Sequence, residues 1–540
     1  MNRLVKMAAA LGALILWSAA SVNAQTGPIA VRTTADVAHA FKVGNWPTYN
    51  GDYTGRRYSG LVQITPANVG QLRAVWVFHS RNAGTLEVTP VVVNGVMYIT
   101  ASNDAYALNA EDGQLLWHYS RPVTDGLIDD ASGHISRGVA VWDNRLYMET
   151  DNAHLLCLDA RSGHLIWDVA YADWNKNYGA TSAPLLVKGK VIVGTSGGDD
   201  GVRGFVAAFD ARTGALAWRR WTIPGPGEFG SSSWPGDLYL HGGGAAWMPG
   251  TFDPELNTLY WGTGNAAPDY DGSVRPGDDL YTACVLALDP DTGKIKWYFQ
   301  FTPHDLYDFD GVETPVLVDR VYQGQPRKLL IEANRNGFIY ILDRTNGKFL
   351  SATRFAQKLN WAKGIDSNGR PILTDVKPTL NGMLTCPGEA GATNWYSPAY
   401  NEGTGLFYFL ALEECTINST KPEEFSEGSE YYATGARRPP DAKGQKRLLA
   451  FDPATGQFAW SYPQTGGARS WGGVMTTASG LVFFADDANS FEAVDAKTGR
   501  SLWHFNTGQP VHASPMSYAV NGKQYVAIAS GDDLFIFALP

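Results

Sequence analysis

The sequence predicts an all-β protein folded as an eight-bladed β-propeller. The first observation is composition, because 59 Gly, 18 Trp and 25 Tyr among 540 residues are typical of many short strands joined by tight turns. The second is a repeat of a small residue, an apolar residue and Asp or Asn, then a turn ending in Gly, then three residues, then Trp. The third is that the repeat or its remnants end at eight equivalent positions: Trp76, Trp117, Trp167, Trp218, Trp297, Leu350, Trp460 and Trp503.

Each copy of the repeat predicts two strands and the turn between them. In AFDPATGQFAW (450–460) an alternating strand ends at the Asp, and the Gly takes a positive φ that other residues resist. A second hairpin precedes most copies, as in VVVNGVMYIT with Asn94-Gly95 and LLVKGKVIVG with Gly189. Four short strands make one blade. Because one blade cannot bury both of its faces, the blades must stack into a ring.

The copies follow one another along the chain at uneven spacing. Near-complete copies lie at 107–117, 157–167, 208–218, 287–297, 450–460 and 493–503, with a weaker copy at 341–350 and a partial one, QLRAVW, before them. The additional residues form insertions at about 221–250 and 351–445. Long loops gathered on one face of a ring usually build its binding site.

The N-terminus reads as a secretory signal over residues 1–24. Arg3 and Lys6 precede an apolar stretch, and small residues at Val22-Asn23-Ala24 offer a cleavage site. We therefore expect a periplasmic protein whose residues 25–540 form a single propeller domain, with an uncleaved membrane anchor as the alternative. No other stretch is apolar enough to cross a bilayer. The formal net charge of −10 and the lack of a basic run disfavour nucleic-acid binding.

Four cysteines occur in a chain that we expect to reach an oxidising compartment. Cys386 and Cys415 flank an irregular polar segment, and we predict that they form the only disulfide. Cys157 and Cys284 lie in apolar runs and are interpreted as buried thiols. No C-x-x-C-H motif is present, so no covalent c-type haem is expected.

The repeated A-x-D-x-x-T-G-x-x-x-W unit resembles the tryptophan-docking motif of the quinoprotein alcohol dehydrogenases, from about Trp46 to Pro540. The resemblance implies a ring that holds pyrroloquinoline quinone (PQQ) and a metal ion on its axis. It also implies oxidation of a small-molecule alcohol to an aldehyde or ketone. Without a haem-binding extension the chain resembles the soluble members, which pass electrons to a separate cytochrome c.

The resemblance assigns candidate cofactor contacts. PQQ is an anionic quinone with three carboxylates, so it needs cations, backbone N–H groups and a flat apolar surface. Arg137 would pair with a carboxylate, Trp247 would lie under the quinone, and Arg335 would reach the quinone oxygens. The other implied contacts are Glu87, Thr150, Thr181, Ser196, Gly197, Gly198, Asn394 and Trp471.

The implied metal site is rich in oxygen ligands. Asp199, Asn265 and Asp308 match family ligands, and Asp308 would also be the general base that takes the hydroxyl proton. Asp310 adds a third carboxylate, and in an extended strand it would share a side with Asp308. We therefore predict a lanthanide ion, with calcium as the alternative. Zinc is disfavoured, because no HExxH, C-x-x-C or spaced His pair occurs.

Two departures from the family pattern affect the site. Asp199 stands where better-known members carry Glu, so its reach to a metal is shorter. Ala131 and Ser132 occupy the place of an adjacent-cysteine disulfide that covers the second face of the quinone in many members, and no replacement cover is predicted. A separate hypothesis concerns the segment 416–441, which is polar, charged and poor in core anchors. We interpret it as a mobile lid, with a solvated loop that has no role as the alternative.

Two other functions compete with this one. Gly194-Thr195-Ser196-Gly197-Gly198 fits the G-x-S-x-G motif of serine hydrolases, which requires a strand-to-helix elbow. The following GVRGFVAAFD reads as a strand, which disfavours that class. A non-enzymatic propeller scaffold of the outer-membrane assembly type would share the blade motif, but it would lack the cluster of Arg137, Asp199, Asn265, Asp308 and Arg335.

Overall fold

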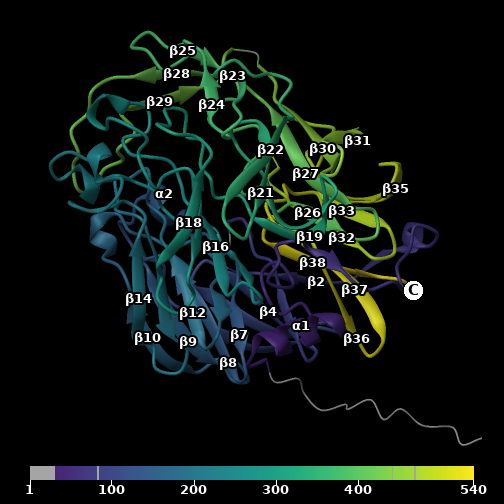
Figure 1. The fold of residues 1–540 in the computed structure, drawn as a ribbon. Coiled ribbons are helices and arrows are strands. Elements are labelled where there is room, and N and C mark those ends of the chain that lie inside the picture. Colours follow the sequence, from purple (N-terminus) through teal and green to yellow (C-terminus); the bar gives the residue numbers. More distant parts are fainter. Residues whose placement is uncertain (1–30, 82–83, 441, 468–469) are drawn as a thin grey trace, which may run out of the picture.

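The structure, a computed structural model, describes residues 31–81, 84–440, 442–467 and 470–540. The signal expected at residues 1–24 lies outside the described residues. Within the described part the chain folds into seven four-stranded sheets and one five-stranded sheet, the eight blades, with two smaller sheets between them. The prediction of an eight-bladed β-propeller is confirmed, and Figure 1 shows the blades following one another around the molecule.

The first five blades are consecutive along the chain, and each contains four antiparallel strands. The first holds β3 (Val91–Val93), β4 (Val96–Ala101), β5 (Asp104–Asn109) and β6 (Leu115–Tyr119). The second holds β7 (Ala140–Trp142), β8 (Arg145–Thr150), β9 (His154–Asp159) and β10 (Leu165–Ala170). The third holds β11 (Leu185–Val187), β12 (Lys190–Gly194), β13 (Phe205–Asp210) and β14 (Leu216–Trp221). The fourth holds β15 (Thr251–Asp253), β16 (Thr258–Gly262), β17 (Cys284–Leu288) and β18 (Ile295–Gln300). The fifth holds β19 (Val316–Tyr322), β20 (Gln325–Ala333), β21 (Phe338–Asp343) and β22 (Lys348–Arg354).

The last three blades include strands from distant parts of the chain. The sixth is β26 (Ala399–Asn401), β27 (Leu406–Glu413), β30 (Gln445–Asp452) and β31 (Gln457–Pro463). The seventh is β32 (Val474–Thr477), β33 (Leu481–Asp486), β34 (Ser490–Asp495) and β35 (Ser501–Asn506), with β1 (Tyr58–Ser59) parallel to β32. The eighth is β36 (Met516–Val520), β37 (Lys523–Ser530) and β38 (Asp533–Ala538), completed by β2 (Arg73–His79) from near the N-terminus. Figure 1 shows β2 beside β38, so the ring is closed by pairing the two ends of the chain.

Packing between blades explains the sequence repeat. All eight repeat-ending residues lie on the outermost strand of a blade, and most of the Trp rings cover the Gly of the turn in the next blade. A Cβ placed on Gly293 would lie 2.4 Å from the Trp218 ring, and the indole Nε1 of Trp218 donates to the carbonyl of Pro290 at 3.0 Å. Glycine is therefore required at this position both for its φ of +68° and for the close approach of the ring.

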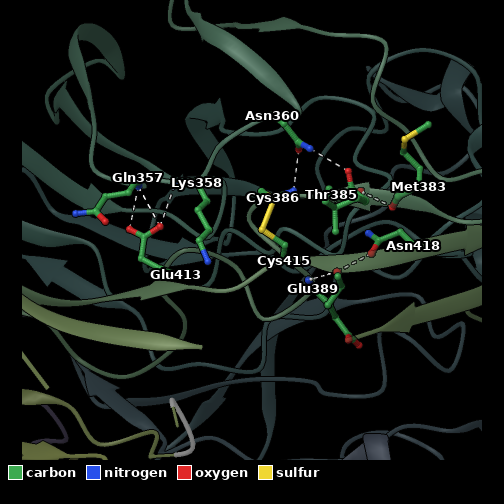
Figure 2. The surroundings of a disulfide bond; sticks show 12 residues. Gln357, Lys358, Asn360, Met383, Thr385, Cys386, Glu389, Glu413, Cys415 and Asn418 are labelled. Atoms are coloured by element: carbon green, nitrogen blue, oxygen red, sulfur yellow. Dashed lines mark hydrogen bonds between the residues drawn. A yellow bond between two sulfur atoms is a disulfide. The ribbon is translucent and has the colours of Figure 1, made fainter. Parts of the chain in front are cut away.

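The insertion at 351–445 forms two small sheets beyond the fifth blade. One is β23 (Ala362–Ile365) with β24 (Pro371–Leu373), and the other is β25 (Met383–Thr385), β28 (Thr416–Thr420) and β29 (Thr434–Arg437). The predicted disulfide joins Cys386 to Cys415, directly after β25 and directly before β28, as Figure 2 shows. Cys157 and Cys284 are buried free thiols, as expected.

In the described part of the chain, two short α-helices accompany the strands, α1 (Thr34–Lys42) and α2 (Asp129–Ser132), together with short 3-10 turns. In the described residues, no helix combines the length and the apolar character that crossing a membrane would require.

Candidate active site

The candidate site residues meet because of blade topology. In an antiparallel blade, the residues just before the first strand and just after the second lie at the same end of the ring. Arg137 precedes β7, Trp247 precedes β15, and Arg335 follows β20. The segments Ser196–Asp199 and Asn265 follow β12 and β16, whereas Asp308 and Asp310 precede β19.

These segments enclose a cavity of about 480 Å³. From the predicted set it is lined by Arg137, Thr181, Ser196, Gly197, Gly198, Asp199, Trp247, Asn265, Asp308, Asp310 and Arg335. A second cavity of about 470 Å³ shares Arg137, Trp247, Asp308 and Arg335 with it and adds Glu87, Asn394 and Trp471. Thr150 lines neither cavity, because its hydroxyl is buried and donates to Asn152 at 2.9 Å.

Arg335 holds two of the three carboxylates that face the first cavity, Asp308 and Asp310. Its guanidinium lies 3.4 Å from Asp308 Oδ1 and 2.9 Å from Asp310 Oδ2. Asp310 also accepts from the Trp247 indole at 3.0 Å and from the backbone N–H of Asn265 at 2.5 Å. Its position is therefore fixed from three sides.

The segment around Asp308 is not the extended strand that we expected. Asp308 has a φ of +63°, and no strand is formed between β18 and β19. The alternation of side chains along a strand therefore does not explain why Asp308 and Asp310 share a side. Both carboxylates nevertheless line the same cavity, because the loop turns at Asp308 and both side chains reach Arg335.

Asp308 combines access with an altered acidity. The side chain of Asp308 is 18% exposed, so a small molecule in the cavity can reach it. Burial raises the pKa of Asp308 well above its usual range. Arg335 opposes this rise, and the Asp199 and Asp310 carboxylates add to it. A positive charge placed among these three carboxylates would relieve their repulsion and lower the pKa of Asp308 again.

Arg137 lies between an acid and two aromatic rings. Its guanidinium pairs with Glu87 at 2.6 Å and donates to the carbonyl of Thr181 at 3.0 Å. Its charge lies 4.4 Å from the centre of the Trp395 ring and 5.1 Å from that of Trp247. The Thr181 hydroxyl donates to the carbonyl of Trp247 at 3.3 Å, which ties this corner together.

The Gly-rich turn after β12 packs closely on its surroundings. Gly197 has a φ of +86°, and a Cβ there would lie 2.1 Å from the carbonyl oxygen of Asn177. The Ser196 hydroxyl donates to the carbonyl of Ala131. Ala131 belongs to α2, and Ser132 at the end of α2 lines the cavity. In place of adjacent cysteines, Ser132 and Gly133 line the first cavity, and Ile135 lines both.

Several residues at the site were not predicted. Trp395, Glu389, Arg438 and His512 line the second cavity. His512 lies just before β36, the first C-terminal strand of its blade, and residues at that position were expected at this end of the ring. Burial lowers the pKa of His512 to about 4. Asp269 is buried beside the site, and burial together with Asp199 and Asp308 raises its pKa.

The residues present fit an anionic planar cofactor and a hard cation. The cavity is within the range of ligand pockets and has carboxylates, an amide and guanidinium groups on its wall. The Nε of Arg137 and the Nδ2 of Asn265 are buried and have no hydrogen-bond partner among the described residues. Buried polar atoms of this kind are normally satisfied, which indicates a place for a bound group.

Comparison with known proteins shows the family. The family description "PQQ: Glucose/ethanol/alcohol dehydrogenase, beta-propeller domain" matches residues 46–356 and 453–526. The chain is 38% identical to the quinoprotein alcohol dehydrogenase PedH of Pseudomonas putida, over 88% of this chain and 84% of that one. It is 35% identical to a 1-butanol dehydrogenase (cytochrome c) of Thauera butanivorans, over 90% of this chain and 74% of that one. A solved europium-containing methanol dehydrogenase superposes with a TM-score of 0.86 at 29% identity, covering 94% of this chain and 100% of the other.

The chain belongs to the PQQ-dependent alcohol dehydrogenase family. It is an oxidoreductase of the quinoprotein type, and the family implies PQQ and a metal ion as its cofactors. The alternative of a non-enzymatic scaffold is therefore set aside.

Proposed function

We propose that this protein oxidises an alcohol in the cavity at the end of the ring, with PQQ and a lanthanide ion held by the residues that line it. The observation that carries the proposal is the convergence of Asp308, Asp310, Arg335 and Trp247 on one cavity, joined there by Asp199 and Asn265. Three carboxylates and one amide oxygen are ligands suited to a hard cation.

Each residue has a role that its contacts support. Arg137, Arg335 and the N–H groups of Gly197 and Gly198 would hold the PQQ carboxylates and quinone oxygens, with Glu87, Thr181, Ser196, Asn394 and Trp471 around them. The N–H of Ser196 itself donates to the carbonyl of Gly179 at 3.1 Å. Thr150 would act through its neighbours, since its hydroxyl is used by Asn152. Trp247 offers a flat surface fixed by its bond to Asp310. Bound PQQ supplies a two-electron acceptor, and Asp308 takes the proton of the alcohol hydroxyl.

The choice of a lanthanide rests on charge. Asp199, Asp308 and Asp310 all line the cavity, and Arg335 is the cation that touches two of them. A trivalent ion offsets the repulsion among three carboxylates better than a divalent one. The related methanol dehydrogenase that contains europium is consistent with this choice.

We further propose a periplasmic location and a soluble cytochrome c as the electron acceptor. The secretory character of residues 1–24 supports the location. The acceptor named for the 1-butanol dehydrogenase relative supports the second proposal.

Reconstitution of metal-free protein with PQQ tests the function. With lanthanum, an alcohol and an artificial electron acceptor, we expect turnover that calcium does not match. Asp308→Asn should lower kcat by roughly 10²–10⁴-fold because the general base is lost. Asp310→Ala should lose the lanthanum-dependent activity, whereas Asp366→Ala, on the exposed turn between β23 and β24, should not. Absence of any alcohol oxidation with PQQ and either metal would refute the function. Equal or greater turnover with calcium would refute the choice of metal.

A further inference from the structure

The segment between β28 and β29, residues 421–433, extends from the small sheet of the insertion and lies against two loops of the site. We call these residues the arm. Figure 1 shows β28 and β29 displaced from β27 and β30 toward α2. We interpreted the segment 416–441 as a mobile lid with few core anchors, but the structure shows anchors within it: Tyr431 is buried, and Phe425 stacks on His241 with 3.6 Å between ring centres. The arm is therefore packed onto the molecule.

The first contact of the arm is with the loop of Asp199. The N–H of Tyr431 donates to the carbonyl of Asp199 at 2.8 Å. A Cβ on Gly201 would lie 2.7 Å from the ring of Phe425, so this ring covers the end of the same loop. The arm thus holds the backbone of Asp199 and covers the residue two positions beyond it.

The side chain of Asn177 connects the arm to the loop of Asp199 by hydrogen bonds to both. Its Nδ2 donates to the carbonyl of Asp200 at 2.8 Å and to that of Ser429 at 3.3 Å, and its Oδ1 accepts from the N–H of Gly428 at 3.1 Å. Asn177 is 3% exposed and has a φ of +67°, a conformation that Asn adopts more readily than most residues. One side chain therefore connects the Gly-rich loop with the arm.

The second contact is with the loop of Asn265. The N–H of Tyr270, five residues after Asn265, donates to the carbonyl of Tyr432 at 3.0 Å. Adjacent residues of the arm, Tyr431 and Tyr432, thus bond to two different loops. Both loops carry residues that line the cavity, Asp199 and Asn265.

We infer that the arm is a clamp that fixes the positions of two metal-ligand loops, and that Asn177 and Phe425 are positioning residues for the metal. The inference rests on the proposed function. Asp199 has one methylene fewer than the Glu expected there, so its side chain has less freedom to reach an ion and depends more on where the backbone is held. Residues behind metal ligands commonly set metal affinity in this way.

The test measures metal affinity instead of activity. Metal-free protein loaded with PQQ is titrated with Tb³⁺, and the luminescence sensitised by tryptophan gives the dissociation constant. Asn177→Gly keeps the positive φ and removes all three side-chain bonds, and Phe425→Ala removes the stack. Each should weaken Tb³⁺ binding by roughly 10–100-fold. Phe425→Tyr should retain wild-type affinity, because an aromatic ring still stacks on His241.

Matched controls separate clamping from general loosening. Asn489 also has a positive φ, of +62°, in the turn between β33 and β34, so Asn489→Gly should leave affinity unchanged. Phe229 is 71% exposed, and Phe229→Ala should also have no effect. Phe425 is only partly buried, so Phe425→Ala decides the question even where Asn177→Gly does not fold. Wild-type affinity in folded Phe425→Ala would overturn the inference alone. If the wild-type protein bound no Tb³⁺, or if Asp308→Ala bound it as tightly as the wild type, the proposed lanthanide site would be refuted as well. Alcohol oxidation with PQQ is tested separately, by the turnover assay described above.

Discussion

Arg335 lies among several buried acids whose pKa values are raised mainly by burial. Its guanidinium contacts Asp308 and Asp310, and its Nε lies 3.7 Å from Glu313. Burial raises the pKa of Glu313 to about 8, with Arg335 opposing the rise. The neighbouring Glu332 is also buried, and burial raises its pKa well above the usual range. One guanidinium thus serves several acids, and the site has room for more positive charge.

Glu149, which is not one of the candidate metal ligands, shows the same effect of burial and gives a prediction about pH. Burial raises its pKa to about 8, although the Tyr171 hydroxyl donates to it at 2.6 Å. Between about pH 4.5 and pH 8 the folded protein keeps a proton that the unfolded chain releases, so this group lowers stability as pH rises through that window. Glutamine does not ionise, so in Glu149→Gln this loss in the free energy of unfolding should be absent. The loss is worth a few kcal/mol near neutral pH, at about 1.4 kcal/mol per pKa unit.

Thermal melting of both proteins between pH 5 and pH 8 checks this prediction. The melting temperature of Glu149→Gln should fall less with pH than that of the wild type. Parallel curves for the two proteins would contradict it.

At the scale of an element, the turn of the repeat has two separable requirements, a positive φ and room for a ring. Gly293 and Gly456 occupy the same turn position with φ of +68° and +71°. Gly293 lies under Trp218, but Gly456 follows the blade whose repeat ends in Leu350, and a Cβ there would meet only Thr353 Oγ1 at 3.6 Å. The two glycines therefore form a natural matched pair.

Gly456→Ala should cost only the backbone penalty, on the order of 1–2 kcal/mol for a left-handed residue. Gly293→Ala should cost more, because its methyl group would also displace the Trp218 ring from its docked position. Urea unfolding of the two variants gives the difference in the free energy of unfolding. A loss at Gly456 as large as that at Gly293 would show that ring docking adds nothing to the requirement for φ.

At the scale of the whole molecule, the ring depends on one junction between distant parts of the chain. β2 pairs with β38 from Arg73↔Ala538 to His79↔Asp533, and β38 also pairs with β37. β2 is the outermost strand of a blade whose other strands are C-terminal. Site residues from the first blade to the eighth can meet on one axis only when this junction is formed.

Truncation after Gly531 should therefore open the ring. It removes β38, which is the strand that β2 pairs with in this sheet, and leaves β37 paired on one side with β36 alone. We expect loss of the cooperative melting transition and of PQQ binding measured by absorbance. Removal of Leu539 and Pro540 alone, beyond the end of β38, is the control and should be tolerated. A cooperative transition in the longer truncation would show that the ring does not require this pairing.

The sequence alone predicted the blades, because the repeat is local. A turn Asp, a Gly and a Trp recur at fixed spacing, and the Gly and Trp are the residues that pack between neighbouring blades. It also indicated the disulfide and, through family resemblance, the residues of the cavity. The position of Leu350 was readable for the same reason, since it breaks the repeat at a point where the next glycine has no ring above it.

Only the tertiary structure decided how the ends of different blades share one axis and what the insertions contact. His512 and Asp269 reach the surroundings of Asp308 from different blades, and no local pattern marks that convergence. The extended geometry expected around Asp308 was replaced by a left-handed turn, because its loop must bring two carboxylates to Arg335. The arm contacts loops more than 150 residues away in the sequence, in part through backbone groups that every residue possesses, such as the N–H of Tyr431 and the carbonyl of Tyr432. Which loops these groups and the side chains of Asn177 and Phe425 meet depends on the path of the folded chain, and no local pattern in the sequence marks it.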